Sequence, residues 1–414
     1  MSSPPPVPVP VPAPAIVSAP GAPPALPRHF PSLDGLRGFG ILVVVCGHGV
    51  LNHPEFTNPV DRALGAAFVP AWVFVDLFFV LSGFLITGIL LDTTRSPTYF
   101  RAFYGRRLLR IWPAYVALLT AVLLVPSLFG ADLAPGLTGW RRAMPWLHLQ
   151  NLDSAYRGFP DYPVLHLWSL GIEEQFYLAW PMIVFFTPRR ALPWVVAGLW
   201  AGSIGFRATM FGRAPTPVFF YTHTLARLDG LCLGGLLALM ARGDGGRPLA
   251  WARRALTTPG TPELLAGVGV GWALFTRLEW WGDTAARCVW NYALVALAMG
   301  ALLMACVRPG PAGPIRRFAE WGPFVRLGQY SYAMYLIHLP LDHFGRKWFW
   351  QTPPGGPRDW PVVSLAPSIF YCAALCAATF AIAWVSWHGM EKRFLELKRW
   401  FPYEKPQNLN AKSR

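Results

Sequence analysis

About ten runs of apolar residues, each long enough for a membrane-spanning helix, occur along the 414 residues, bounded by charges, glycine or proline. A helix needs roughly 20 residues to cross the hydrocarbon of a bilayer. Apolar residues make up 54% of the chain and charged residues 14%, a balance that excludes an ordinary soluble protein. The sequence therefore predicts an all-α, polytopic membrane protein. The predicted spans are 39–56, 64–91, 111–130, 164–186, 190–211, 216–241, 262–281, 286–307, 323–345 and 361–387.

The formal net charge of +15 would suggest a polyanionic partner in a soluble protein, but in a membrane protein it marks cytoplasmic loops. An even number of spans places both termini on one side. The loops on that side are rich in arginine, and the opposite loops, which include Arg141, Arg142 and Arg346, carry about half as many cations. We therefore predict cytoplasmic termini, a multi-pass protein of the inner (plasma) membrane in contact with its lipids, and no nucleic-acid partner.

The domain organisation follows from the ends of the apolar region. Residues 1–29 are dominated by proline, valine and alanine, which predicts a disordered cytoplasmic leader. Residues 30–394 form the predicted membrane domain, and 395–414 a basic cytoplasmic tail. The longest outer loop, 131–163, is where a separate extracytoplasmic partner would be contacted. No sequence pattern indicates a metal site, and the six cysteines read as small buried apolar residues.

The first span carries two chemically active side chains. Arg37 lies in the segment LDGLRG, and His48 follows it by eleven positions, which is about three helical turns. In a straight helix both face the same way, roughly 16 Å apart along the axis. This spacing suits a long ligand whose phosphorylated head is held by Arg37 while its reactive end reaches the imidazole, a group suited to general-base chemistry. The alternative for His48 is a neutral imidazole, hydrogen-bonded inside the bundle.

Three arginines follow the second span. Arg106, Arg107 and Arg110 are three or four positions apart, so they form a compact guanidinium cluster on a helix. Planar guanidinium forks suit the pyrophosphate and 3′-phosphate of a nucleotide. The alternative is an anchor that touches lipid phosphates on the cytoplasmic side.

Further polar residues lie within the apolar runs, where each is costly unless it has a partner or a function. Asp76 is either a structural acceptor for a neighbouring helix or part of a pocket. Arg227 and Asp229 are two positions apart and point different ways, so their partners must come from other helices. The remaining candidates for a pocket are Ser82, His166, Glu173, Glu174, Tyr335 and His338.

Two of these groups can be interpreted further. The adjacent acids Glu173 and Glu174 would be costly without partners, which favours a helix whose acids orient a histidine or a sugar hydroxyl. The tyrosine-rich segment with Tyr335 and His338 is either an interfacial belt or a wall that faces a sugar.

Six motifs follow one another along the chain. They are LDGLRG with the Arg37 and His48 pair, FFVLSGFLI at Phe78 to Ile86, RRLLRIWP at Arg106 to Pro113, HLWSLGIEEQFYL at His166 to Leu178, SYAMYLIH at Ser331 to His338 and EKRF at Glu391 to Phe394. In this order they resemble the acyltransferase-3 family of bacterial membrane O-acyltransferases, and the resemblance extends from Ser32 to Phe394.

The resemblance implies transfer of an acyl group, often acetyl, from cytoplasmic acyl-CoA to a hydroxyl of a carbohydrate-containing acceptor. It implies that His48 is the base or acyl-relay residue, Arg37 its partner, and Arg107 with Arg110 the acyl-CoA contacts; Glu173 or Asp76 would orient the imidazole or the acceptor. No permanently bound cofactor is expected. The alternative is a transporter or flippase of a glycolipid or sugar, which the absence of a visible internal repeat disfavours.

Overall fold

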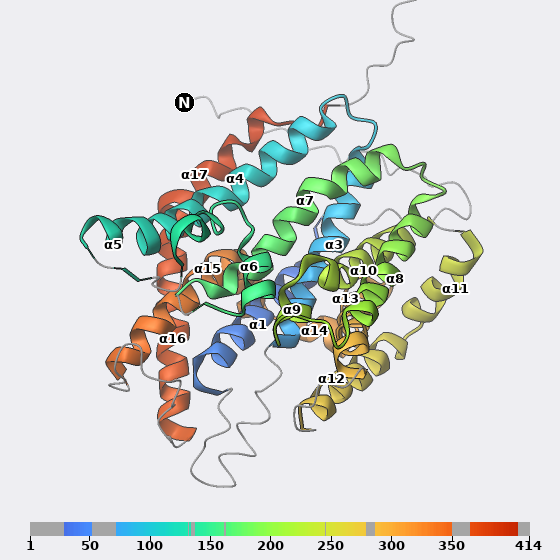
Figure 1. Cartoon of the computed structure of the whole chain (residues 1–414). Helices are drawn as coiled ribbons and strands as arrows, with labels where there is room; N and C mark the ends of the chain where they lie inside the picture. The colour runs from blue at the N-terminus through green and yellow to red at the C-terminus, as the bar shows by residue number, and fades with distance from the viewer. Residues whose placement is uncertain are drawn as a thin grey trace, which may run out of the picture.

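The computed structural model describes residues 29–51, 72–130, 132–133, 137–160, 163–244, 246–278, 286–349 and 365–404. All regular secondary structure within these residues is helical, as predicted (Figure 1). Most of the predicted leader and residues 405–414 of the predicted tail lie outside them. The long helices are α1 (Pro31–Cys46), α3 (Val73–Thr93), α4 (Tyr99–Leu119), α7 (Trp168–Phe186), α8 (Leu192–Met210), α10 (Thr224–Ala241), α12 (Thr261–Leu278), α13 (Asn291–Val307), α15 (Gly322–Phe349) and α16 (Leu365–Ser386).

Shorter helices connect these elements or extend them. They are α5 (Val125–Leu128), α6 (Gln150–Arg157), α9 (Phe219–Thr222), α11 (Gly246–Thr257), α14 (Pro314–Ala319) and α17 (Lys392–Glu396). Two π-helical turns matter below: Gly47–Leu51 continues α1, and Trp387–Glu391 continues α16.

One long helix overlaps each predicted span. Five helical stretches of the described chain are long and apolar enough to cross a membrane, which supports a membrane protein; they are Val73–Thr93, Tyr99–Leu128, Thr224–Ala241, Arg287–Val307 and Pro367–Trp400. The count of ten crossings and the side of the termini stay predictions. Three of the differences from the predicted boundaries concern residues discussed below. Helix α1 starts at Pro31, α4 starts at Tyr99 and therefore includes the arginine cluster, and α15 extends to Phe349 and includes Arg346.

Glycines allow the closest helix contacts. A Cβ added at Gly83 of α3 would lie 2.0 Å from the carbonyl oxygen of Leu231 in α10. A Cβ at Gly38 of α1 would lie 2.0 Å from the carbonyl oxygen of Phe324 in α15. Helix backbones can approach this closely only where no side chain intervenes, as in other membrane bundles. These two contacts bring α3 against α10 and α1 against α15, and so set the positions of four central helices.

Two ion pairs between fully buried side chains link helices of the bundle. The guanidinium of Arg227 in α10 donates to Asp76 in α3 at 2.9 Å, and Arg207 in α8 lies 2.8 Å from Asp229 in α10. The partners of Arg227 and Asp229 therefore do come from other helices, as predicted. Burying one of these charges without its partner would cost several kcal/mol.

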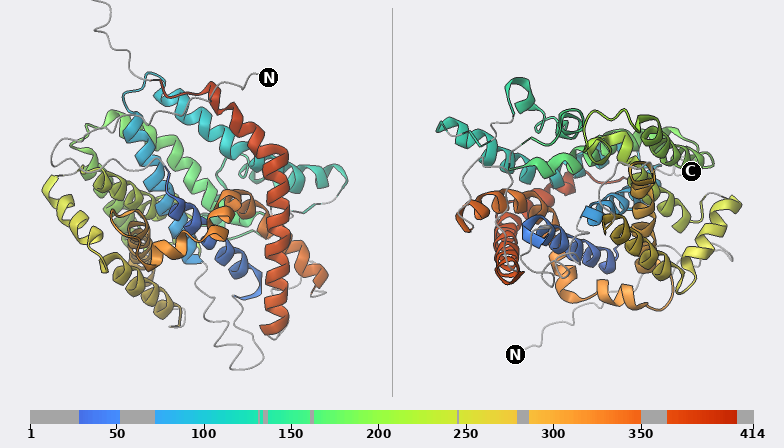
Figure 2. Two further views of the ribbon diagram at one scale, coloured as in Figure 1. Left: turned by 180° about the vertical axis from the view of Figure 1, so that it is seen from behind. Right: turned by 60° about the horizontal axis from the view of Figure 1, so that its bottom comes forward.

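Ion pairs also join loops at one end of the bundle. Arg242, after α10, pairs with Asp92 of α3 at 2.8 Å, and Arg189, after α7, pairs with Asp244 at 2.9 Å. Figure 2 shows α16 continuing through its π turn into α17, which bends and runs beside α4. The C-terminal segment therefore lies beside the helix that carries the arginine cluster.

Candidate active site

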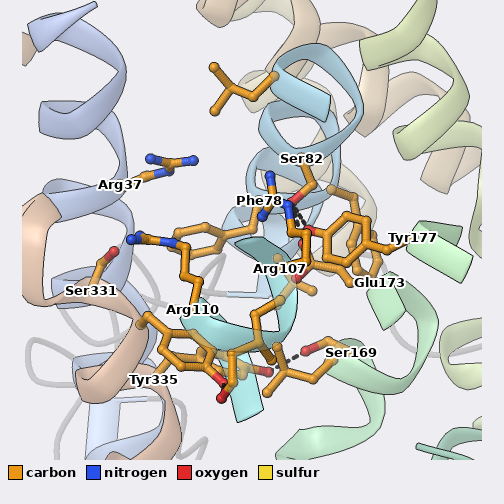
Figure 3. A pocket seen from close by; sticks show the side chains of 16 residues that line it. Arg37, Phe78, Ser82, Arg107, Arg110, Ser169, Glu173, Tyr177, Ser331 and Tyr335 are labelled. Carbon is orange, nitrogen blue, oxygen red and sulfur yellow. Dashed lines mark hydrogen bonds between the residues drawn. The ribbon is translucent and has the colours of Figure 1, made fainter. Parts of the chain in front are cut away.

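Five helices, α1, α3, α4, α7 and α15, surround a cavity of about 820 Å³, counted with the space at its mouth. Figure 3 shows side chains from these helices pointing into it. The lining residues are Arg37, Val75, Phe78, Phe79, Ser82, Leu85, Arg107, Arg110, Ile111, Ser169, Leu170, Glu173, Tyr177, Ser331, Tyr332 and Tyr335. Six of the predicted site residues therefore share one cavity: Arg37, Ser82, Arg107, Arg110, Glu173 and Tyr335.

Three guanidinium groups reach this cavity from two helices. Arg37 lies 3.2 Å from Asp34 on its own helix, and Figure 3 shows its guanidinium and that of Arg110 directed into the same space. The guanidinium of Arg107 lies 5.0 Å from the centre of the Tyr177 ring. Among the described residues, no carboxylate forms an ion pair with Arg107 or Arg110. Cations without a carboxylate partner in a half-buried cavity are suited to binding an anionic ligand.

Arg106 lies outside the cavity, although the sequence grouped it with Arg107 and Arg110. Its guanidinium donates to the carbonyl of Phe401 at 3.0 Å and to that of Lys398 at 3.4 Å. It also lies 5.7 Å from the centre of the Tyr403 ring. Consecutive helical residues point in directions about 100° apart, so Arg107 faces inward while Arg106 holds the C-terminal segment.

A hydrogen-bonded chain of three side chains, the acidic wall, lies beside Arg107 in the cavity (Figure 3). The hydroxyl of Tyr177 donates to Ser82 Oγ at 2.9 Å, and Ser82 Oγ donates to Glu173 Oε1 at 2.5 Å. Glu174 is not in the lining, and one of its buried oxygens has no hydrogen-bond partner among the described residues. Asp76 is not in the lining either, because its carboxylate pairs with Arg227.

Three histidines gather behind the end of the cavity that Tyr335 closes. The Tyr335 hydroxyl accepts a hydrogen bond from Ser169 at 2.5 Å and donates to the carbonyl of His166 at 2.8 Å. The His338 ring centre lies 5.4 Å from that of Tyr335, 4.8 Å from His166 and 5.1 Å from His48. His48, His166 and His338 are therefore close together, and the cavity-lining Tyr335 contacts the rings of His166 and His338.

His48 sits where the first helix changes its winding. Helix α1 ends at Cys46, and the chain continues as the π turn Gly47–Leu51, with a non-helical ψ of −111° at Gly49. The regular α-helix that carries Arg37 therefore ends two residues before His48, and the non-helical residue follows directly after it. Arg37 lines the cavity, whereas His48 turns toward His338.

Sequence reasoning missed the side chains that hold this turn. Arg346 donates short hydrogen bonds to the carbonyls of His48 and Gly49 and pairs with Asp342 at 2.7 Å. The hydroxyl of Tyr371 donates to Asp342 at 3.0 Å. The sequence predicts an outer loop at Arg346, but this residue belongs to α15. The spacing of Asp342 and Arg346, four positions apart and typical of a helical pair, was the signal available in the sequence.

The fold and this site define a class: a helical membrane protein with an internal, arginine-lined cavity beside a histidine cluster. Residues 30–388 match the sequence model described as an acyltransferase domain, and the chain belongs to the acyltransferase-3 family.

Three similar proteins illustrate the relationship. The chain is 27% identical over 354 residues to the O-acetyltransferase OatA of Staphylococcus aureus, covering 78% of this chain and 52% of that protein. It is 28% identical over 386 residues to the peptidoglycan O-acetyltransferase OatA of Listeria monocytogenes (88% and 55%), and 27% identical over 351 residues to the putative peptidoglycan O-acetyltransferase YrhL of Bacillus subtilis (78% and 51%). The chain thus spans about half the length of these relatives. No solved structure matches it.

Proposed function

We propose that this chain is a membrane O-acyltransferase that moves an acyl group, foremost acetyl, from cytoplasmic acyl-CoA to a hydroxyl of a carbohydrate acceptor. One observation carries the proposal: Arg107 and Arg110 face a cavity without a carboxylate partner, and Tyr335, which lines the same cavity, adjoins the histidine cluster. A phosphate-rich head group and a reactive end some distance away are the two features of acyl-CoA that such a cavity would accommodate. The family membership supports acyl transfer as the chemistry.

In this mechanism the donor's phosphates bind Arg107 and Arg110, and its thioester lies toward Tyr335 and the histidines. Acting as a base, His48 accepts the proton of the acceptor hydroxyl. The hydroxyl oxygen then forms an ester bond to the acyl carbon, the carbon–sulfur bond breaks, and the CoA thiolate leaves and takes a proton. As an acyl relay, His48 would first form a bond to the acyl carbon while the carbon–sulfur bond breaks and the CoA thiolate leaves. The acceptor hydroxyl would then take the acyl group, and its proton would return to the released imidazole.

The acidic wall would position groups in this reaction. Ser82 and Tyr177 hold the Glu173 carboxylate in place, and Glu173 would orient the acceptor hydroxyl. Arg37 and Arg110 would together neutralise the negative charge of the donor's phosphates. Asp76, with its carboxylate occupied by Arg227, would stabilise the bundle.

We infer that the acceptor is a cell-envelope glycan. Two of the relatives described above are named for peptidoglycan O-acetylation, which makes peptidoglycan the first acceptor to test. A donor in the cytoplasm and an acceptor outside it would require a protein that crosses the inner membrane. The positive-inside rule would place both termini of this multi-pass protein in the cytoplasm. The outer loop that contains α6 would contact an extracytoplasmic partner that presents the glycan.

Slow thioester hydrolysis by the purified protein tests the donor half of this function without knowledge of the acceptor. Wild type should release CoA thiol from acetyl-CoA, and His48→Ala should not, while its thermal unfolding stays that of wild type. A transporter or flippase would move a glycolipid or sugar without acyl-CoA. No thiol release by folded wild type, together with sugar translocation in liposomes, would favour that alternative.

A further inference from the structure

The hydrogen bonds of His338 determine which of its nitrogens carries the proton. Its Nδ1 lies 2.6 Å from the carbonyl oxygen of Tyr335, and its side chain is fully buried. A carbonyl only accepts hydrogen bonds, so Nδ1 of a neutral His338 must donate. The Nε2 atom of His338 is therefore left with a free lone pair.

The same reasoning applies to His48. Its Nδ1 lies 3.1 Å from the carbonyl oxygen of Val44 and 3.3 Å from Nε2 of His338. Both atoms are acceptors, so Nδ1 of His48 carries the proton and shares it between them. In a neutral imidazole the other nitrogen is then unprotonated. The geometry thus places the lone pair of His48 on Nε2.

The two acceptors of His48 differ in origin. Val44 lies one turn earlier in α1, so its carbonyl moves with the segment that carries His48. His338 lies in α15 and is the acceptor that ties the ring to a different helix. Arg346, two turns further along α15, fixes the backbone of the same turn through the carbonyls of His48 and Gly49. Helix α15 therefore holds both the main chain and the ring of His48.

We propose that His338 is a positioning residue for His48, which it holds in the tautomer and orientation that leave Nε2 free to react. This inference rests on the proposed function, because both a general base and an acyl relay use that lone pair. The sequence suggested that His338 faces the substrate, but it is absent from the cavity lining, where Tyr335 stands in front of it. Its role is exerted through His48.

Two substitutions of one residue separate the hydrogen bond from the volume. His338→Leu fills much of the space and cannot accept a hydrogen bond. His338→Gln can place an amide oxygen near the position of Nε2 and restore the acceptor. The matched control is His388→Leu, because His388 is exposed and its ring lies beside Trp384 of α16 and Tyr330, away from His48.

The experiment combines ¹⁵N imidazole shifts of His48, identified by their loss in His48→Ala, with turnover of acetyl-CoA. We expect His338→Leu to convert the Nδ1–H signal of His48 into a tautomer mixture and to lower turnover about 10- to 100-fold, with CoA affinity unchanged. His338→Gln should restore both, and His388→Leu should alter neither. A wild-type tautomer signal and full turnover in His338→Leu would overturn the inference. Wild type that turns over no acetyl-CoA would instead refute the proposed function, and the shift would still report whether His338 sets the tautomer.

Discussion

Replacing Arg110 by alanine should weaken CoA binding far more than replacing Arg106, although both changes remove one positive charge from α4. The guanidinium of Arg110 faces the cavity without a carboxylate partner, so a phosphate there would gain a charge-assisted hydrogen bond. Such a bond contributes about 1.5–3 kcal/mol. Because 1.4 kcal/mol corresponds to about a tenfold change in affinity, Kd should rise roughly 10- to 150-fold.

Arg106 is the matched control for this prediction. It lies on the same helix, one turn from Arg110, but its guanidinium bonds to main-chain carbonyls of Lys398 and Phe401. Isothermal titration of CoA into purified wild type, Arg110→Ala and Arg106→Ala measures all three affinities in one buffer. Equal weakening in the two variants would refute the assignment, since it would mean that only the overall positive field of the helix attracts the donor. Wild-type affinity in Arg110→Ala would refute it as well.

Three further predictions concern the acidic wall, the helix packing and the segment between α5 and α6. Glu173→Gln keeps a hydrogen-bond acceptor for Ser82 but removes the negative charge that would orient the acceptor hydroxyl. CoA should therefore bind as tightly as in wild type, while turnover falls about 100-fold. Weaker CoA binding in this variant would contradict the proposed role of Glu173. Gly83→Ala should lower the unfolding free energy by about 1–3 kcal/mol, because the added Cβ would meet a backbone oxygen. Gly198→Ala is the control, since a Cβ there meets open space and should not lower the unfolding free energy. Equal melting temperatures of the two variants would disprove the packing argument. Burial lowers the pKa of His148 to about 4 from its usual 6.5, so the unfolded chain binds the proton first as the pH falls. Stability should therefore be retained above pH 6.5 and decrease by about 2 kcal/mol at pH 5. His148→Phe, which can still stack on Tyr115, should lose that dependence in melting curves recorded at the two pH values; an unchanged dependence would exclude His148 as its source.

The sequence predicted the helices well because their signal is local. Each long apolar run is itself the condition for a buried or membrane-spanning helix, and a long helix overlaps every predicted range. The proximity of Arg107 and Arg110 was also predictable, since residues three apart share a helix face. The need of Asp76 for a partner followed from the cost of an isolated charge, and the structure supplies Arg227.

The remaining features depend on how the helices rotate against one another, which no local spacing encodes. Whether Arg106 or Arg107 faces the cavity is decided by packing against α7 and the C-terminal segment. The turn at His48 departs from α-helical winding. Its carbonyl accepts a hydrogen bond from Arg346, which is almost three hundred positions away in sequence. The sequence spacing from Arg37 gives no sign of this non-helical turn at Gly49 or of the contact between His48 and His338. The histidine cluster needs three helices, and only the assembled bundle brings their side chains together.

The central claim is that an acyl group passes from CoA to a glycan hydroxyl through this cavity and His48. The most direct measurement supplies acetyl-CoA labelled in the acetyl group to the purified protein in proteoliposomes, with peptidoglycan fragments as acceptor. The account predicts base-labile label on the glycan with wild type and none with His48→Ala of equal thermal stability. Equal labelling of the glycan by His48→Ala would contradict it.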